Sequence, residues 1–296
     1  MAWIFLTIGA VIMQTIRNAL QSQLSVKVDT LGVTLARFIF APPIAFAYLC
    51  LLYFFAPALG FEQLIPSFTV KFVVLVCLAA LFQIAATSFM VMLFKQKNFA
   101  IGAGLAKSEA LVAGVLGTLF FGSQLSLLGW LGILLGAMAV FVLSSGNRLQ
   151  GLSPKTLLTG LLCGTCFALT SLLVREASLL LDVAFPFSAA WVLLWVLCIQ
   201  TLCLILYIAL TSPYVFGQLI RQMKATIATS TTSCLGSICW FSAMALQHVA
   251  YVKTLGQLEV LSTLLLAHFW LKNKVKLHEI AGLLLIACAA ILVMWA

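Results

Sequence analysis

Two acidic residues inside apolar segments are the first candidates for chemistry in this sequence. Glu109 and Glu259 each lie near the middle of a long apolar stretch, and they are 150 positions apart. A charged side chain near the centre of a bilayer costs about 2.5–3.5 kcal/mol on insertion scales, so each acid is a candidate functional residue. A carboxylate in a low-dielectric interior needs a proton, a cation or a substrate ammonium close to it. The alternative is that each acid caps a backbone group or packs as a neutral residue.

Basic and amide side chains stand at fixed spacing from both acids. Lys107 precedes Glu109 by two positions, so on a helix the two side chains point to nearly opposite sides. Gln257 has the same relation to Glu259, and Lys253 shares the face of Gln257. Both segments therefore combine an acidic face with a basic or amide face, as expected of a helix between a cavity and its neighbours. Lys253 has a second interpretation, because a lysine near a helix start often snorkels to the headgroups.

Arg37 is the candidate for binding an anionic group. It lies inside another apolar stretch, and a guanidinium can hold a carboxylate through two parallel hydrogen bonds. The alternative role is to tie helices together through carbonyl oxygens. Pro42 and Pro43 follow within two turns, and they predict a kink that frees backbone carbonyls.

Three further residues are expected to shape a pocket around these charges. Gln14 and Gln83 are polar residues in apolar stretches, and Trp240 lies in a stretch rich in small polar residues. An indole ring attracts cations to its face. The alternative for Trp240 is a position against lipid or at the membrane interface.

The elements that must position these residues are membrane-spanning helices. The chain of 296 residues is 64% hydrophobic and only 8% charged, which excludes an ordinary soluble globule. A spanning helix needs about 20 apolar residues, and every backbone amide in it must be satisfied internally. We therefore predict an all-α membrane protein with ten transmembrane helices, near residues 2–24, 31–55, 71–94, 99–121, 126–144, 154–175, 186–210, 223–246, 250–271 and 277–295.

Composition also argues against several other classes. The net charge of +9 comes from basic residues scattered at the ends of apolar runs, which indicates membrane anchors and no nucleic-acid partner. The nine cysteines are odd in number and mostly lie in apolar segments, so they do not predict a disulfide framework. Cys163 and Cys166 have metal-ligand spacing but no second ligand pair. No motif for hydrolysis or ATP binding occurs, so we expect neither an enzyme nor a cofactor or metal.

An internal repeat is found when the sequence is shifted by 150 positions. The residues that meet identical partners from 250 onward are mostly Leu or Ala, which match by chance, so the pairs Glu109 with Glu259 and Gly132 with Gly282 carry the evidence. The predicted units are residues 1–147 and 148–296. If each unit has five helices, an odd number, the second enters the membrane from the opposite side and the repeat is inverted.

Loop charges predict one orientation for the chain. The connections after odd-numbered helices hold most basic residues, which are Lys27, Lys95, Lys97, Arg148, Lys155, Arg221, Lys224, Lys272, Lys274 and Lys276. Basic loops stay in the cytoplasm, so this distribution places both termini outside.

Two stretches resemble the EamA-type proteins of the drug/metabolite transporter superfamily. One is 98–137, with Lys107-Ser108-Glu109-Ala110 and Leu-Leu-Gly-Trp-Leu-Gly at 127–132, and the other joins 255–260 to 277–282. Arg37 stands in a Leu-x-Arg-Phe-like context, and the likeness covers nearly the whole chain. The motifs are short, and Ala110 and Val260 stand where family members often have proline.

This resemblance implies two inverted five-helix halves around a central cavity, walled mainly by helices one to four and six to nine. It implies a multi-pass transporter in the plasma (inner) membrane of a bacterium, which exports a small metabolite such as an amino acid without ATP. Family members usually have both termini in the cytoplasm, against the loop charges, so the orientation stays open. A homodimer through 126–144 and 277–295 is one possible assembly. The alternatives are an uncoupled facilitator or channel and a membrane-embedded lipid-modifying enzyme.

Overall fold

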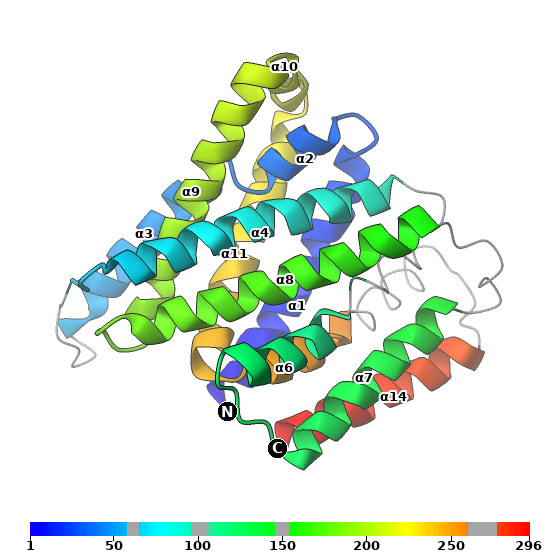
Figure 1. The fold of residues 1–296 in the computed structure, drawn as a ribbon. Coiled ribbons are helices and arrows are strands. Elements are labelled where there is room, and N and C mark those ends of the chain that lie inside the picture. Colours follow the sequence, from blue (N-terminus) through cyan, green and yellow to red (C-terminus); the bar gives the residue numbers. More distant parts are fainter. Residues whose placement is uncertain (58–64, 96–105, 107, 146–153, 260–276) are drawn as a thin grey trace.

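The computed structural model describes residues 1–57, 65–95, 106, 108–145, 154–259 and 277–296, and within these ranges the chain forms helices and no strand (Figure 1). The all-α prediction is confirmed for these residues. The helices are α1 (Ala2–Leu24), α2 (Thr30–Ala36), α3 (Ala41–Phe55), α4 (Val70–Phe94), α6 (Glu109–Phe120), α7 (Leu127–Ser145), α8 (Pro154–Leu180), α9 (Phe187–Thr211), α10 (Tyr214–Arg221), α11 (Met223–Leu246), α12 (Val249–Leu255) and α14 (Leu277–Met294).

Among the described residues, five helical segments are long and apolar enough to cross a membrane. They are Ala2–Leu24, Thr30–Phe55, Val70–Phe94, Pro154–Leu180 and Phe187–Thr211. These segments indicate a membrane protein. Helix α11 has a similar length but carries a stripe of small polar residues at helical spacing, Thr226, Ser230, Ser233 and Ser237, which are all buried. Its polar face therefore points into the protein, where it can line a polar interior.

The second predicted helix is interrupted in its first half. Helix α2 ends at Ala36, a turn covers 37–40, and α3 begins with two prolines in its first turn. Proline cannot continue the ladder of backbone bonds, and two carbonyls of the turn accept side-chain hydrogen bonds. The Phe38 carbonyl accepts one from Thr201 (3.0 Å) and the Arg37 carbonyl accepts one from Ser230 (3.5 Å). The break that the prolines predict is present. Arg37 is the C-cap residue of α2, whereas the sequence predicts a position inside a helix for it.

The sixth predicted helix is longer than expected and carries two charged residues in its last turns. Helix α8 continues to Leu180, five residues beyond the predicted end at 175. Arg175 donates from Nη1 to the carbonyls of Met244 (2.6 Å) and Gln247 (2.5 Å). Glu176 pairs with Lys71 at 3.5 Å. Because both charged side chains have partners at the end of the bundle, they do not have to terminate the helix.

Close packing between helices far apart in the sequence builds the bundle. The most extensive pairs are α1 with α11, α4 with α8, and α7 with α14, and the last pair lies at one edge (Figure 1). Glycine allows the backbones of α7 and α14 to approach, since a Cβ on Gly132 would stand 2.7 Å from Val293 Cγ2 and 3.1 Å from the Ala289 carbonyl. Gly132, one of the residues that the internal repeat matches, therefore serves helix packing within the chain.

Candidate functional site

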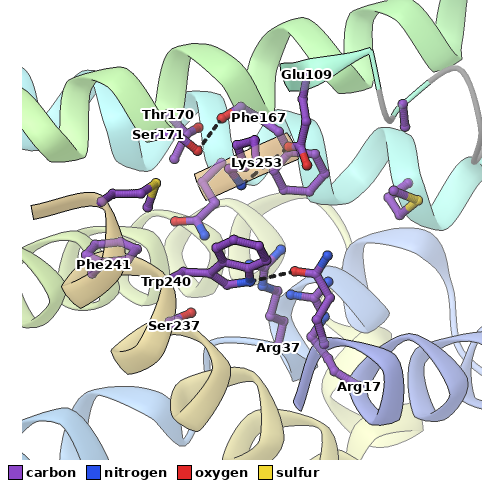
Figure 2. Close-up of a pocket in the computed structure, with 15 residues that line it drawn as sticks. Arg17, Arg37, Glu109, Phe167, Thr170, Ser171, Ser237, Trp240, Phe241 and Lys253 are labelled. Atoms are coloured by element: carbon purple, nitrogen blue, oxygen red, sulfur yellow. Dashed lines mark hydrogen bonds and ion pairs between the residues drawn. The ribbon is translucent and has the colours of Figure 1, made fainter. Parts of the chain in front are cut away.

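A cavity lined by both polar and apolar side chains lies between α1, α4, α6, α8, α11 and α12 and receives side chains from both halves of the chain (Figure 2). Five of the predicted site residues line it, together with further residues from α1, α4, α8, α11 and α12. The lining residues are Gln14, Arg17, Arg37, Gln83, Met90, Ala106, Glu109, Phe167, Thr170, Ser171, Ser237, Trp240, Phe241, Met244 and Lys253. Trp240, for which a lipid-facing position was the alternative, is also in this lining and is 6% exposed.

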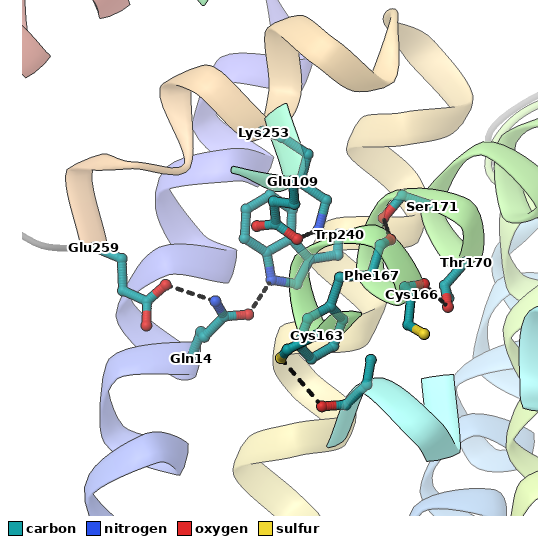
Figure 3. A network of polar contacts seen from close by, with 11 residues as sticks. Gln14, Glu109, Cys163, Cys166, Phe167, Thr170, Ser171, Trp240, Lys253 and Glu259 are labelled. Atoms are coloured by element: carbon teal, nitrogen blue, oxygen red, sulfur yellow. Dashed lines mark hydrogen bonds and ion pairs between the residues drawn. The ribbon is translucent and has the colours of Figure 1, made fainter. Parts of the chain in front are cut away.

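Glu109 forms a buried ion pair across the two halves. It is the first residue of α6, and its Oε2 lies 3.4 Å from Nζ of Lys253 on α12. The Lys253 ammonium also lies over the Trp240 ring, 4.4 Å from the ring centroid (Figure 3). All three residues are buried. A carboxylate and an aromatic face on the same ammonium are a favourable combination in a dry site.

Glu259 is held by two amides from α1. Gln14 donates from Nε2 to Oε2 at 2.6 Å, and Asn18 donates from Nδ2 to Oε1 at 2.5 Å. Gln14 in turn accepts a hydrogen bond from Trp240 Nε1 at 2.9 Å (Figure 3). Glu259 itself does not line the cavity, but Gln14 and Trp240 link it to the Glu109–Lys253 pair. The two acids therefore belong to one connected network.

Arg37 points into the cavity from the break between α2 and α3. Its Nε donates to Ser233 Oγ at 3.1 Å and its Nη1 donates to Thr87 Oγ1 at 2.7 Å. Its guanidinium carbon lies 5.2 Å from the Phe38 ring centroid and 5.9 Å from that of Phe167. A guanidinium carries five N–H donors, so two hydroxyl partners leave it with donors for a further acceptor. Arg37 is 4% exposed.

The remaining predicted site residues have different positions. Gln83 lines the cavity and accepts a hydrogen bond from Gln200 Nε2 at 2.6 Å. Gln257 is buried outside the cavity lining, against Gly136 of α7, and neither amide atom has a hydrogen-bond partner among the residues that the structure describes. It lies in a turn between α12 and Glu259, and the turn directs its side chain to α7 instead of the cavity. Lys107 lies outside the described residues.

Three contributors to the site were not selected as site residues from the sequence. Asn18 binds Glu259, Lys253 binds Glu109, and Arg17 lines the cavity while donating from Nη2 to Asn18 Oδ1 at 2.8 Å. A signal for the α1 residues is present, because Gln14, Arg17, Asn18 and Gln21 recur at helical spacing on one face. Lys253 has no comparable signal, since snorkelling and an interior ion pair predict the same residue type at a helix end.

Comparisons with known proteins describe the fold and leave the chemistry open. No family model and no curated protein matches the chain. A solved structure described as "Crystal structure of protein" is similar with a TM-score of 0.68 over 96% of this chain and 98% of that chain, at 17% sequence identity. At that identity the likeness shows a shared fold only. The architecture is therefore one that a second protein also adopts over its full length.

The buried cations around the cavity outnumber the buried acids, which favours the binding of an anionic group. The described residues place three buried cations here, Arg17, Arg37 and Lys253, against the two buried acids. A buried charge is stable only when it is paired or well hydrogen-bonded. The cavity could therefore hold a ligand that brings an acceptor to Arg37 and a donor to the acidic part of the network.

Proposed function

We propose that this protein is a secondary transporter, and specifically an exporter, of a small metabolite such as an amino acid or a related amphipathic compound. The observation that carries the proposal is the cavity and the polar network connected to it, which join two buried acids, buried cations and amides from both halves of a largely apolar chain. Ionisable groups inside a membrane protein mark substrate or ion pathways, because burying them without such a role is unfavourable.

The helix pairing supports an inverted repeat of two five-helix halves. If α1 corresponds to α8 and α4 to α11, the contact of α1 with α11 corresponds to the contact of α4 with α8. The same exchange maps the pairs α7 with α14 and α6 with α12 onto themselves. An inverted repeat provides two equivalent arrangements of the halves, one open to each side of the membrane, and the site lies between them.

Interrupted helices next to the site are a second support. One interruption lies between α2 and α3 at Arg37, and another lies in the turn at Gly256 and Gln257, just before Glu259. Transporters commonly bind substrates at such breaks, because unpaired backbone groups and helix ends point into the cavity there. Ionisable side chains at a break are also placed to move with the half-helix that carries them.

Each charged residue has a role in this mechanism. Glu109 and Glu259 would bind a substrate amine or a coupling proton, and Arg37 would bind an anionic group or lock a gate. Gln14, Gln83 and Trp240 would shape the pocket. Rocking of one half against the other exposes the site alternately, without ATP. The resemblance to EamA-type proteins, a bacterial plasma membrane and export as the direction all form part of this proposal.

Flux measurements on a carboxylate variant test the proposal. Purified protein is reconstituted in liposomes, and uptake of ¹⁴C-labelled amino acids, tested one at a time, is followed with and without a pH gradient. Glu259→Gln should abolish or uncouple the flux, while Glu176→Gln, which removes an acid from an ion pair outside the cavity, should leave it unchanged.

Each other outcome has a definite meaning. Unchanged flux in Glu259→Gln would remove Glu259 from the mechanism. Wild-type flux that does not respond to the pH gradient would indicate an uncoupled facilitator. The absence of flux for every amino acid would contradict the substrate class.

A further inference from the structure

The Lys253 ammonium is bound by groups that would suit any primary ammonium ion. Glu109 Oε2 lies 3.4 Å from Nζ, and the centroid of the Trp240 ring lies 4.4 Å from it (Figure 3). A carboxylate supplies charge and a hydrogen-bond acceptor, and an indole face attracts a cation within about 6 Å of its centroid. Neither group needs the rest of a lysine side chain, so recognition depends on the ammonium alone.

The two binding groups come from helices other than the one that carries Lys253. Trp240 donates from Nε1 to Gln14, and its ring packs on Gly256, where a Cβ would stand 2.5 Å from Cη2 of the indole. The backbone of Glu109 is fixed in the first turn of α6. The site comes from α6 and α11, whereas the ammonium comes from α12. Both groups therefore stay in the cavity wall when the ammonium is removed.

We propose that Glu109 and the Trp240 ring form a binding site for a primary ammonium ion, which the chain's own Lys253 fills in this state. A ligand with a primary ammonium group binds there by taking the place of Lys253. One carboxylate and one ring then serve one cation at a time, so the two ammonium groups exclude each other. Lys253 acts as a tethered competitor, and its flexible four-carbon side chain lets the ammonium leave the site.

The exchange explains why a lysine is buried in the cavity wall. An empty Glu109 would be an unpaired buried carboxylate, which is strongly unfavourable. Lys253 keeps that carboxylate paired until a ligand ammonium arrives, and the ligand then takes over the same contacts. This inference deepens the proposed function, because it assigns the chemical class of one group of the substrate, but it concerns binding and does not require transport.

Chemical rescue of a truncated lysine tests the site directly. Lys253→Ala removes the three methylenes and the ammonium beyond Cβ, and n-propylammonium supplies the same atoms. The thermal unfolding temperature of the purified variant in detergent is measured against increasing n-propylammonium chloride, with sodium chloride at equal ionic strength and 1-propanol as controls.

The expected result is a saturable rise in the unfolding temperature of Lys253→Ala with n-propylammonium and no rise with 1-propanol. At a ligand concentration about ten times Kd, the folding equilibrium constant should increase about tenfold by mass action. The double variant Lys253→Ala/Glu109→Gln should lose this response, and Lys253→Met, which fills the space without a charge, should show none.

Two results would overturn the inference. The first is a folded Lys253→Ala protein that does not respond to n-propylammonium. The second is an equal response in the double variant, which would place the ammonium elsewhere. If Lys253→Ala cannot be purified alone, the yield of folded protein after extraction in n-propylammonium gives the answer. Recovery of the single variant but not of the double variant supports the site, and recovery of both or of neither contradicts it.

Because no flux is measured, this test can fail while transport persists, and the transport test can fail while ammonium exchange persists. A protein that binds n-propylammonium at Glu109 but moves no amino acid would keep the site and lose the transporter. If the wild type transports amino acids but the Lys253→Ala variant does not respond to n-propylammonium, the transporter proposal stands and the ammonium site is lost.

Discussion

Glu109 and Glu259 occupy equivalent positions in the sequence repeat but have different partners. Glu109 pairs with the Lys253 ammonium at 3.4 Å, whereas Glu259 accepts hydrogen bonds from the Gln14 and Asn18 amides at 2.6 Å and 2.5 Å. Both carboxyls are buried. One half of the duplicated site is thus built around an ion pair, and the other around amide hydrogen bonds.

The difference determines what each carboxyl can do. Protonation of Glu109 leaves Lys253 without the charge that pairs with it. Glu259 is held as an acceptor, because the amide nitrogens of Gln14 and Asn18 donate to it while their amide oxygens already accept from Trp240 and Arg17. The Glu109 region is therefore suited to exchange cations, whereas the Glu259 region is a fixed set of hydrogen bonds.

The largest effect should follow removal of the charge on Glu109. In Glu109→Gln the Lys253 ammonium stays buried without its carboxylate, and breaking such a pair from one side costs about 3–5 kcal/mol. Adding Lys253→Met should restore most of the lost free energy of unfolding, since neither position of the double variant carries a charge. The free energies of unfolding of the wild type, the two single variants and the double variant form a double-mutant cycle. Measured in detergent, they give the coupling energy between Glu109 and Lys253.

An ion pair at the end of the bundle serves as the control for this cycle. Lys71 and Glu176 are 3.5 Å apart, but their side chains are 63% and 33% exposed. An exposed pair contributes about 0.2–1 kcal/mol, so the same cycle here should give a small coupling. Equal coupling in the two cycles would mean that the cavity pair is solvated and would remove the basis for the comparison.

The sequence predicts which residues meet in the cavity better than it predicts how they pair. Buried acids, Arg37, Gln14, Gln83 and Trp240 could be chosen because polar groups in apolar helices have few other places to go. The break after α2 follows from two consecutive prolines. Their identity as kinking residues does not depend on the rest of the fold.

The pairing itself depends on contacts between helices that the sequence does not reveal. Lys253 and Glu109 lie 144 positions apart, and no local pattern links them. Gln257 illustrates the same limit, because a turn of the backbone sends its side chain to Gly136 although its spacing to Glu259 is as expected. Arg175 stands at the predicted end of a helix, and no local pattern shows that the carbonyls that accept from it come from residues 244 and 247.

A smaller effect is expected at the second carboxyl. Glu259→Gln keeps the shape of the side chain, but its amide nitrogen faces a donor from Gln14 or Asn18. Losing one hydrogen bond to a charged acceptor should cost about 1.5–3 kcal/mol. Thermal unfolding compares the variant directly with Glu109→Gln. A loss larger than that of Glu109→Gln would reverse the comparison and make Glu259 the structural carboxyl of the two.

The smallest effect should come from the residue that connects the two regions. Trp240→Phe removes the Nε1 donor to Gln14 Oε1 but keeps an aromatic face beside Lys253. The lost hydrogen bond should cost about 0.6–2 kcal/mol, as for side-chain hydrogen bonds inside other membrane proteins. Trp240→Leu removes the aromatic face as well and serves as the matched variant.

The two Trp240 variants separate the hydrogen bond to Gln14 from the contact of the aromatic ring with the ammonium. In the Lys253→Ala background, Trp240→Phe should still respond to n-propylammonium with reduced affinity, because a phenyl face attracts a cation less strongly than an indole. Trp240→Leu should weaken that response much further. If both variants respond equally, the ring face does not bind the ammonium, and Trp240 contributes to the Glu109 region only through its bond to Gln14.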